Sequence, residues 1–219
     1  MFRRESEWIR EALAGIDLPG GSEALDVGCS VAAYRSTLQP HVQTNVRGPL
    51  EAHGVTVVGL DIKQEQGVDV VCDITDDPGA VLGTVGRRFP LLLCNNTLVH
   101  VGDVDAALRS LVALVADRGH LLVTTPRSFR KTDDPFDNAF RPHPEELAER
   151  IGAHSGGAFE LVRAELLRID DADYYRRGLH RSHIQIGSRW IVVPAFVEQM
   201  RRRVPRLRWT EACVLMRRA

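Results

Sequence analysis

Short apolar runs alternate with amphipathic stretches along the first two thirds of this chain. The runs are nearly continuous in hydrophobic residues, as is typical of strands covered on both faces of a sheet. We expect strands at 24–27, 55–60, 68–72, 91–94 and 121–124. Apolar residues at helical spacing predict helices near 5–15, 32–38, 78–85 and 104–115, with a polar loop holding Pro40, Asn45, Gly48 and Pro49 after the second. This alternation predicts an α/β fold with a parallel sheet and right-handed crossovers.

After residue 126 the pattern becomes irregular. Residues 127–144 are polar and rich in proline, aspartate and phenylalanine, too charged and aromatic for a mere linker. A helix is expected to begin at Pro144, because proline suits the first helical position and the two glutamates that follow favour the positive helix N-terminus. Strands are expected at 159–169 and 208–217, separated by an insertion at 171–208. We interpret residues 1–219 as a single domain, because a second one would be crowded at this length.

Small and acidic residues stand where the first two predicted strands end. The first strand runs into Asp26–Ser30, with the sequence DVGCS, and the second ends at Asp61. A glycine lets the backbone approach a ligand closely, and a carboxylate after the second strand can accept both hydroxyl hydrogens of a ribose. Ser30 and Ala32 replace the later glycines of the dinucleotide motif G-x-G-x-x-G. The pattern therefore predicts a nucleoside-bearing ligand that is not a dinucleotide.

These residues, with further segments in the same order, resemble the class I S-adenosylmethionine-dependent methyltransferases. The match starts with the LDVGC form of the family's first motif at 25–29 and continues at the ends of the later strands. Those ends are Leu60–Ile62, Val71–Ile74, Cys94–Val101 and Asp117–Pro126. The resemblance implies a Rossmann-like, doubly wound, mostly parallel sheet with an antiparallel last strand.

The resemblance also implies a cofactor, S-adenosylmethionine, its product S-adenosylhomocysteine, and the residues that hold them. It places the methionine part beside Asp26 and Gly28, the ribose at Asp61, the adenine at Asp73 with Ile74, and the methionine or sulfonium side at Asn95. The expected cofactor-binding set is Asp26, Gly28, Cys29, Asp61, Ile62, Asp73, Ile74 and Asn95. Structural roles remain open, since Asp26 or Asp73 can also cap a helix or turn. Asn96 either replaces a binding residue or ends its strand.

Two histidines, His100 and His143, are the candidates for a catalytic base. Methyl transfer from a sulfonium needs an in-line approach and, for a hydroxyl acceptor, removal of a proton, which suits a histidine. His100 lies in a segment that the family often has near the cofactor or acceptor, although a packed histidine at a helix start explains it as well. His143 lies in a stretch similar to the Phe-Arg-x-Thr-Pro segment of sugar and small-molecule methyltransferases, which borders the acceptor pocket.

The irregular segments are expected on the acceptor side. Residues 127–144 would form an acceptor-side loop whose acids Asp133, Asp134 and Asp137 can hold a metal or an amine, although scattered loop acids are more often solvated or capping. No set of acids from two strand ends suits a metal, so no metal site is expected and a metal-independent reaction is favoured. Residues 171–208 are interpreted as a lid, as an interface for a possible homodimer, or as plain packing.

Composition and charge limit the partners and the location. The net formal charge is −1 and no basic groove interleaved with aromatics is visible, so no nucleic-acid partner is expected. The four cysteines show no metal-ligand spacing and are expected to be reduced. No run approaches ~20 apolar residues, and acids stand where a signal peptide would be apolar. We therefore expect a cytoplasmic protein without stable membrane insertion.

The leading hypothesis is methyl transfer from S-adenosylmethionine to oxygen or nitrogen of a small-molecule acceptor, a sugar or secondary metabolite. Two alternatives come from other classes. A nicotinamide-dependent oxidoreductase is disfavoured by the missing phosphate glycines and by the absence of a Tyr-x-x-x-Lys pair. A catalytically inactive relative that binds the cofactor and serves as a partner or regulator stays open, because Ser30 and Ala32 depart from the family pattern.

Overall fold

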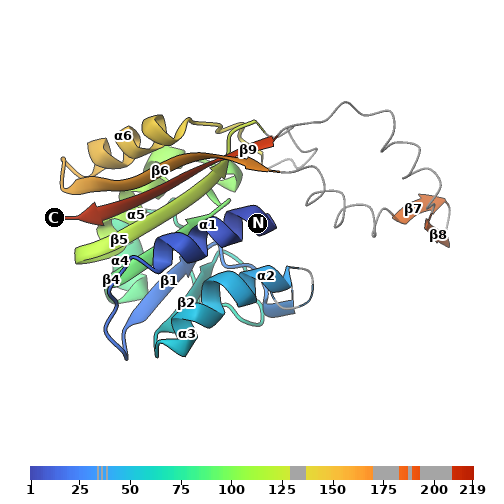
Figure 1. Cartoon of the computed structure of the whole chain (residues 1–219), viewed down its shortest axis with the longest axis horizontal. Coiled ribbons are helices and arrows are strands. Elements are labelled where there is room, and N and C mark those ends of the chain that lie inside the picture. Colours follow the sequence, from blue (N-terminus) through green and yellow to red (C-terminus); the bar gives the residue numbers. More distant parts are fainter. Residues whose placement is uncertain are drawn as a thin grey trace.

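A seven-stranded sheet forms the centre of the fold (Figure 1). The structure, a computed structural model, describes residues 1–33, 35, 37, 39–128, 137–169, 183–186, 189–192 and 209–219. The strand order is β3-β2-β1-β4-β5-β9-β6, in which β9 pairs antiparallel with both of its neighbours, β5 and β6. The parallel pairs are β1 with β2 and β4, β2 with β3, and β4 with β5. The predicted Rossmann-like sheet with an antiparallel last strand is confirmed.

The strands lie close to the predicted ranges. Their bounds are β1 Glu23–Val27, β2 Thr56–Asp61, β3 Val70–Val71, β4 Phe89–Asn95, β5 Val115–Pro126, β6 Phe159–Ile169 and β9 Trp209–Arg218. The third strand is shorter than the predicted 68–72. Asp69 already bonds to Gly59 through its backbone N–H (2.8 Å) and through its carboxylate, which accepts the Gly59 N–H (2.7 Å). A side-chain oxygen thus takes the place of a backbone carbonyl there, and the regular ladder begins one residue later.

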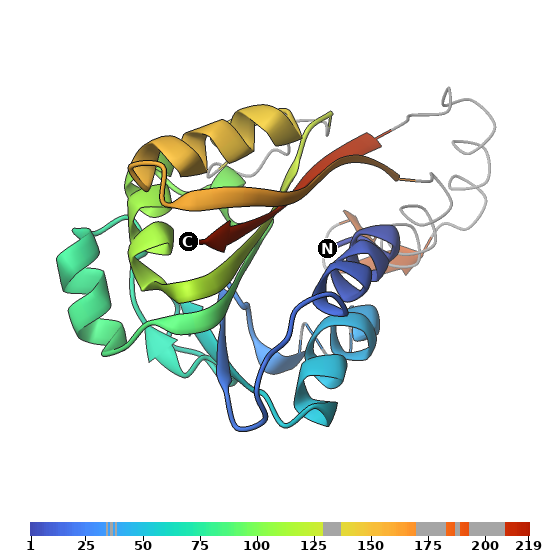
Figure 2. The same ribbon diagram turned by 60° about the vertical axis from the view of Figure 1, so that its left-hand side comes forward.

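Helices cover both faces of the sheet (Figure 2). One layer consists of α4 Pro78–Val85, α5 Val104–Leu114 and α6 Pro144–His154, and the other of α1 Arg3–Leu13, α2 Pro40–Val42, the π-helical η2 Gln43–Arg47 and α3 Gly48–Ala52. Each layer buries its own apolar cluster. Leu25 and Val27 of β1 face the first layer, whereas Ala24, directly before Leu25, faces the second, as the alternation of a strand requires.

The predicted polar loop around Pro40, Asn45, Gly48 and Pro49 is wrong, because residues 40–52 are helical throughout. Proline occupies an early position of both short α-helices. Pro49 has no N–H to donate, and the π-helical turn directly before it accommodates this break in the hydrogen-bond pattern. Asn45 is turned inward and donates from Nδ2 to Ser6 Oγ (2.9 Å). Polar residues that look solvated in the sequence therefore face a neighbouring helix.

Parts of three predicted segments lie outside the described residues. These are positions 34, 36 and 38 of the expected helix at 32–38, residues 129–136 of the acceptor-side loop, and most of the 171–208 insertion. Within the insertion the structure describes an antiparallel pair, β7 His183–Ile186 with β8 Arg189–Val192. The division into one domain, a loop and a lid or interface stays a prediction.

Candidate functional site

Glycine is required at position 28, in the turn after β1. Gly28 has a left-handed φ of +71°, and a Cβ built on it would lie 2.1 Å from Thr97 Oγ1. The Thr97 hydroxyl in turn donates to the Val27 carbonyl (3.0 Å). The N–H groups of Gly28 and Cys29 both donate to the Leu60 carbonyl, at 2.8 and 3.2 Å. The turn is thus fixed between the ends of β2 and β4, at the point where the strand order reverses and where open α/β sheets bind ligands.

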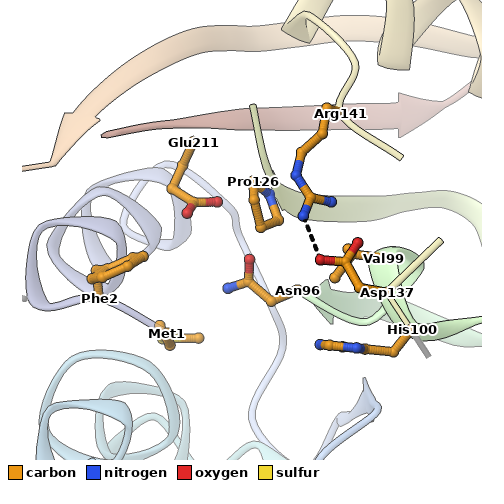
Figure 3. Close-up of a pocket in the computed structure, with 9 residues that line it drawn as sticks. All are labelled: Met1, Phe2, Asn96, Val99, His100, Pro126, Asp137, Arg141 and Glu211. Atoms are coloured by element: carbon orange, nitrogen blue, oxygen red, sulfur yellow. Dashed lines mark hydrogen bonds and ion pairs between the residues drawn. The ribbon is translucent and has the colours of Figure 1, made fainter. Parts of the chain in front are cut away.

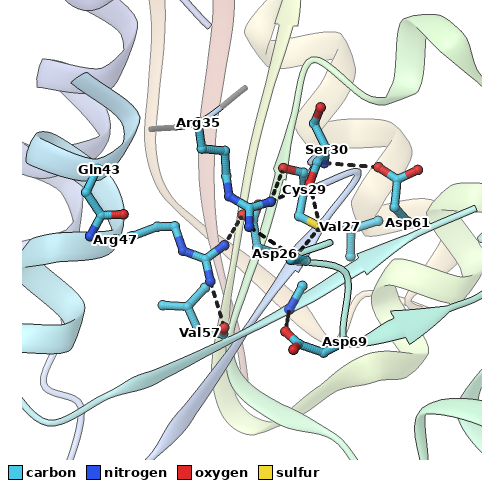
Figure 4. A network of polar contacts seen from close by, with 12 residues as sticks. Asp26, Val27, Cys29, Ser30, Arg35, Gln43, Arg47, Val57, Asp61 and Asp69 are labelled. Atoms are coloured by element: carbon cyan, nitrogen blue, oxygen red, sulfur yellow. Dashed lines mark hydrogen bonds and ion pairs between the residues drawn. The ribbon is translucent and has the colours of Figure 1, made fainter. Parts of the chain in front are cut away.

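Asp61 joins the end of β2 to this turn (Figure 4). Its Oδ2 accepts the backbone N–H of Ser30 (3.0 Å), and its Oδ1 accepts that of Lys63 (3.2 Å). A carboxylate has about four acceptor positions, so both oxygens retain capacity for further donors. The neighbouring Ile62 is 60% exposed. A carboxylate with spare acceptor positions beside an exposed apolar side chain fits a ribose with its attached base.

Asp73 and Ile74 follow β3. Asp73 Oδ1 accepts both the backbone N–H (2.9 Å) and the hydroxyl (2.7 Å) of Thr75, which forms a tight side-chain-capped turn. Ile74 is 6% exposed and packs in the core against the first helical layer. Only its backbone is therefore available to a ligand, whereas the carboxylate of Asp73 is half-buried at the surface of the turn.

Asp26 points toward the helical segment 40–52 (Figure 4). Its Oδ2 lies 3.3 Å from Arg47 Nη1, and Arg47 also donates from Nη2 to the Val57 carbonyl (2.8 Å). Burial raises the pKa of Asp26, and the nearby guanidinium groups of Arg47 and Arg35 oppose this rise. These contacts give Asp26 a structural role, that of tying the helical segment to β1.

Arg35 holds the far side of the same turn, and sequence reasoning did not identify it. The guanidinium donates to the carbonyls of Cys29 (2.6 Å) and Gly67 (3.0 Å) and also to that of Ser30. Burial raises the pKa of the Cys29 thiol to about 12, so this side chain is a neutral packing group. In the sequence, nothing but its basic side chain distinguishes Arg35, and many other residues share that property.

Asn95 and Asn96 end β4 differently. Asn95 Oδ1 lies 3.2 Å from the Thr124 hydroxyl, on the neighbouring strand β5. Asn96 has a left-handed φ of 57° and donates from Nδ2 to Glu5 Oε1 (2.7 Å). Glu5, on α1, is fully buried and also accepts the Thr124 hydroxyl (2.6 Å) and the Phe2 N–H (2.9 Å). The helix α1 is therefore tied to the strand ends by a buried carboxylate that sequence reasoning placed merely at a helix start.

A pocket of about 170 Å³ opens beside Asn96 (Figure 3). Its walls come from the N-terminal segment with Phe2, the 3₁₀ turn η3 Leu98–His100, the start of β9 with Glu211, and Arg141 before α6. Glu211 pairs with Pro126 at the end of β5. The pocket thus lies at the carboxyl ends of β4 and β5, on the same edge of the sheet as Asp61.

The structure brings one of the two candidate histidines into this pocket. His100, at the end of η3, lines it and is exposed. His143 is exposed at the start of α6, and its Nε2 lies 2.9 Å from Arg127 Nη2. It is not among the residues that line the pocket. Of the two, His100 is the one whose position suits contact with a bound molecule.

The described end of the acceptor-side loop, residues 137–143, is anchored to η3. Asn138 donates from Nδ2 to the carbonyls of Leu98 and Val101, at 2.8 Å each. Asp137 is 6% exposed and forms an ion pair of 2.8 Å with Arg141 Nη2. Asp137 is therefore a partner of an arginine, while Asp133 and Asp134 lie outside the described residues.

Glu211 lines the pocket, and sequence reasoning missed it. Its side chain is fully buried, and neither carboxylate oxygen has a hydrogen-bond partner within the described part of the chain. Burial raises the pKa of Glu211 well above its ordinary value, and the nearby Glu5 raises it further. No signal in the sequence separates this glutamate from the exposed ones, because its burial depends on the pairing of β9 with β5.

Among the residues that the structure describes, no group of three His, Cys, Asp or Glu side chains is placed to hold a metal ion. No helix in the described part of the chain is long and apolar enough to cross a membrane.

Comparison with known sequences gives one match. The profile of a family described as a methyltransferase domain matches residues 1–181. No curated protein sequence matches the chain.

Several solved structures share the fold at low sequence identity. The [4+2]-cyclase SpnF is 17% identical with a TM-score of 0.59, and the match covers 99% of this chain and 80% of that one. A methyltransferase described as S-adenosylmethionine-dependent, from Archaeoglobus fulgidus, is 13% identical with a TM-score of 0.57 over 98% and 94% of the two chains. A putative sarcosine dimethylglycine methyltransferase from Galdieria sulphuraria is 15% identical with a TM-score of 0.55 over 98% and 85%. These likenesses concern the arrangement of the elements.

Proposed function

This chain belongs to the methyltransferase-domain family, and from that membership we propose that it transfers a methyl group to oxygen or nitrogen of a small-molecule acceptor. It is an S-adenosylmethionine-dependent methyltransferase with a class I fold, as the strand-end motifs predicted. We place the acceptor among sugars and secondary metabolites and propose a metal-independent reaction.

The residues at the carboxyl ends of β1 to β3 fit the cofactor. Asp61 would hold the ribose hydroxyls, the exposed Ile62 would pack on the adenine, and Asp73 would accept from its amino group. The turn at Gly28 and Cys29 would lie beside the methionine part. When bound, the cofactor supplies an electrophilic methyl group on a sulfonium. Asp26 contributes indirectly in this arrangement, because its carboxylate is engaged by Arg47.

The observation that carries the acceptor proposal is the pocket at the ends of β4 and β5. Its volume of about 170 Å³ suits a small group, and its walls carry charged and polar side chains. It lies on the sheet edge that carries Asp61, next to the turn where the strand order reverses. A small polar group held there is close to the site proposed for the cofactor. Residues 171–208 remain the proposed lid or dimer interface.

His100 is the proposed base for a hydroxyl acceptor, because it lines the pocket. A hydroxyl oxygen must lose its proton as it forms the new bond, and a base within hydrogen-bond reach assists this. His143 is the second candidate for the base, because its imidazole contacts Arg127 and is not part of the pocket lining.

The replacement Asp61→Ala tests this site. Losing the carboxylate removes the acceptor proposed for both ribose hydroxyls, so the affinity for S-adenosylhomocysteine should fall by about tenfold or more, at about 1.4 kcal/mol per tenfold. Isothermal titration calorimetry measures the affinity directly. Asp117→Asn is the matched control, because this side chain is 81% exposed at the other end of β5. Unchanged affinity in Asp61→Ala would remove Asp61 from the cofactor site.

The alternative function is an inactive relative that binds the cofactor and acts as a partner or regulator. Ser30 favours it, because this residue holds a left-handed φ of 57° where the family pattern has glycine. The fold alone does not decide, since one structure with this fold is described as a cyclase. Binding of S-adenosylmethionine without turnover on any of a broad set of amines, alcohols and sugars would support the alternative.

A further inference from the structure

The carboxylate of Glu211 differs from the other acids around the pocket, because it has no hydrogen-bond partner among the described residues. Glu5 accepts hydrogen bonds from Asn96, Thr124 and the Phe2 backbone. Asp137 is paired with Arg141. Glu211 is just as buried as Glu5, yet both of its oxygens lack a donor among the described residues. An ionised carboxylate that is buried without a partner is strongly disfavoured, so a donor supplied from outside the chain would be favoured.

The charges around the pocket favour a cation. Glu211 faces Glu5 of α1, the Asp137–Arg141 pair, the amino terminus and His100. The Arg141 guanidinium is already engaged, since it donates to the Asp137 carboxylate (2.8 Å) and the Phe140 carbonyl (3.0 Å). Burial and Glu5, which raise the pKa of Glu211, outweigh the amino terminus and Arg141, which lower it. When Glu211 is ionised, the three carboxylates of Glu211, Glu5 and Asp137 outnumber these two cations, and the excess negative charge repels an anionic ligand.

A second acceptor atom points into the same space. Asn96 donates from Nδ2 to Glu5, and this bond fixes its orientation so that Oδ1 faces away from Glu5. Oδ1 is buried and has no partner among the described residues. Figure 3 shows Asn96 and Glu211 on neighbouring walls of the pocket. The wall therefore offers three unfilled acceptor atoms, two on Glu211 and one on Asn96.

We propose that the acceptor carries a protonated amino group and that Glu211, with Asn96 Oδ1, holds it. An ammonium brings both a positive charge and two or three N–H donors, which match the unfilled acceptors. A hydroxyl brings one donor and no charge, so it would leave the buried carboxylate uncompensated. Glu211 is thus a specificity-determining residue, and the inference rests on the proposed methyl transfer to a small molecule.

Binding of small probes that differ only in this group tests the inference. The protein is first saturated with S-adenosylhomocysteine and then titrated with ethylamine, ethanolamine and benzylamine, each beside its alcohol counterpart: ethanol, ethylene glycol and benzyl alcohol. Ligand-observed NMR measures the weak affinities. At least one amine should bind about tenfold or more tightly than its alcohol, as expected for a charge-assisted contact.

The variants Glu211→Gln, Glu211→Asp and Glu160→Gln assign that preference to one side chain. Glu211→Gln keeps the shape but removes the charge, so the amine affinity should fall by about tenfold or more while alcohol binding stays unchanged. Glu211→Asp should retain part of the preference. Glu160→Gln is the control, because Glu160 is exposed on β6 and pairs with Arg217 at the other end of β9. S-adenosylhomocysteine should bind all three variants with wild-type affinity.

Three results would overturn the inference: alcohols that bind as well as amines, no amine binding at all, or an amine preference that survives in Glu211→Gln. The first of these is expected if Glu211 is protonated and donates a hydrogen bond instead. In each case normal binding of S-adenosylhomocysteine leaves the methyltransferase proposal standing. Failure of S-adenosylhomocysteine to bind the wild-type protein would overturn both.

Discussion

At the scale of single residues, Gly28 and Gly21 show the difference between a glycine needed for its backbone angle and one needed also for space. Both have a left-handed φ, +71° and +83°. A Cβ on Gly28 would overlap Thr97, whereas no described heavy atom lies within 4 Å of a Cβ on Gly21. The strand-end position of Gly28 was visible in the sequence, but the close approach of Thr97 was not, since 69 positions separate the two residues.

The replacement Gly28→Ala should destabilise the fold by about 3 kcal/mol or more. The left-handed angle costs an alanine about 1–2 kcal/mol, and the overlap with Thr97 adds about 1–3 kcal/mol. Gly21→Ala is the matched control and should cost only the penalty of the left-handed angle, about 1–2 kcal/mol. Urea unfolding followed by circular dichroism gives both free energies. Equal losses in the two variants would show that Thr97 yields to the added methyl group.

At the scale of elements, the helical segment 40–52 is held to β1 by a largely buried ion pair between Arg47 and Asp26. The side chains of Arg47 and Asp26 are 11% and 12% exposed, and Arg47 reaches across to the Val57 carbonyl of β2 as well. The segment also buries Val46 and Leu50 in the core. These contacts stabilise a helix whose two prolines and one glycine predict a loop. Tertiary contacts therefore overrode the local preference of the sequence in this segment.

The replacement Arg47→Met should cost about 3 kcal/mol of unfolding free energy, because it leaves the Asp26 carboxylate buried without its partner. The double variant Asp26→Asn/Arg47→Met should recover part of this loss, which a double-mutant cycle quantifies. Arg87→Met is the control, since the Arg87–Glu23 pair is exposed and should contribute about 1 kcal/mol or less.

The variant Asp26→Asn alone also separates the two interpretations of this residue. If Asp26 only ties the segment 40–52 to β1, the affinity of the variant for S-adenosylhomocysteine stays near that of the wild type. A fall of about tenfold or more would favour the direct contact with the methionine part that the family resemblance implies.

At the scale of the whole molecule, buried carboxylates make the stability depend on pH. The pKa of Glu211 is raised above its ordinary value of 4.5, mainly by burial and also by Glu5 on α1, while the amino terminus and Arg141 oppose the rise. The folded state therefore binds more protons than the unfolded state above pH 4.5. Stability must then fall as the pH rises from about 4.5 to the folded pKa and stay constant beyond it.

The variant Glu211→Gln should flatten this dependence. Urea unfolding at a series of pH values from 4 to 8 measures it, and the decline in the wild type has a maximum slope of about 1.4 kcal/mol per pH unit for one group. Asp26, whose pKa is also raised by burial, should leave a weaker decline in the variant. Asp105 acts in the opposite direction, because its hydrogen bond with His154 lowers its pKa and its contribution is lost toward acid. Identical pH profiles for wild type and variant would show that Glu211 does not titrate with folding.

The sequence by itself determined the mostly parallel sheet, with the antiparallel last strand that the family resemblance implies, and the residues at the strand ends. Continuous apolar runs identify buried strands wherever they stand, and small or acidic residues mark where such strands end, because both features are local. The third strand and the segment 40–52 were misjudged where a side chain, Asp69 or Asn45, makes a contact that no local pattern reveals.

Only the tertiary structure decided what the pocket is made of. Asn96, Arg141 and Glu211 come from the end of β4, the segment before α6 and the start of β9, and they meet because the antiparallel β9 returns along β5. Whether a glutamate is buried, and whether it has a partner, depends on what the rest of the chain places around it. That is why motifs could predict the cofactor. The amine preference proposed for the acceptor depends instead on a buried carboxylate that has no partner in the described part of the chain, which only the fold makes visible.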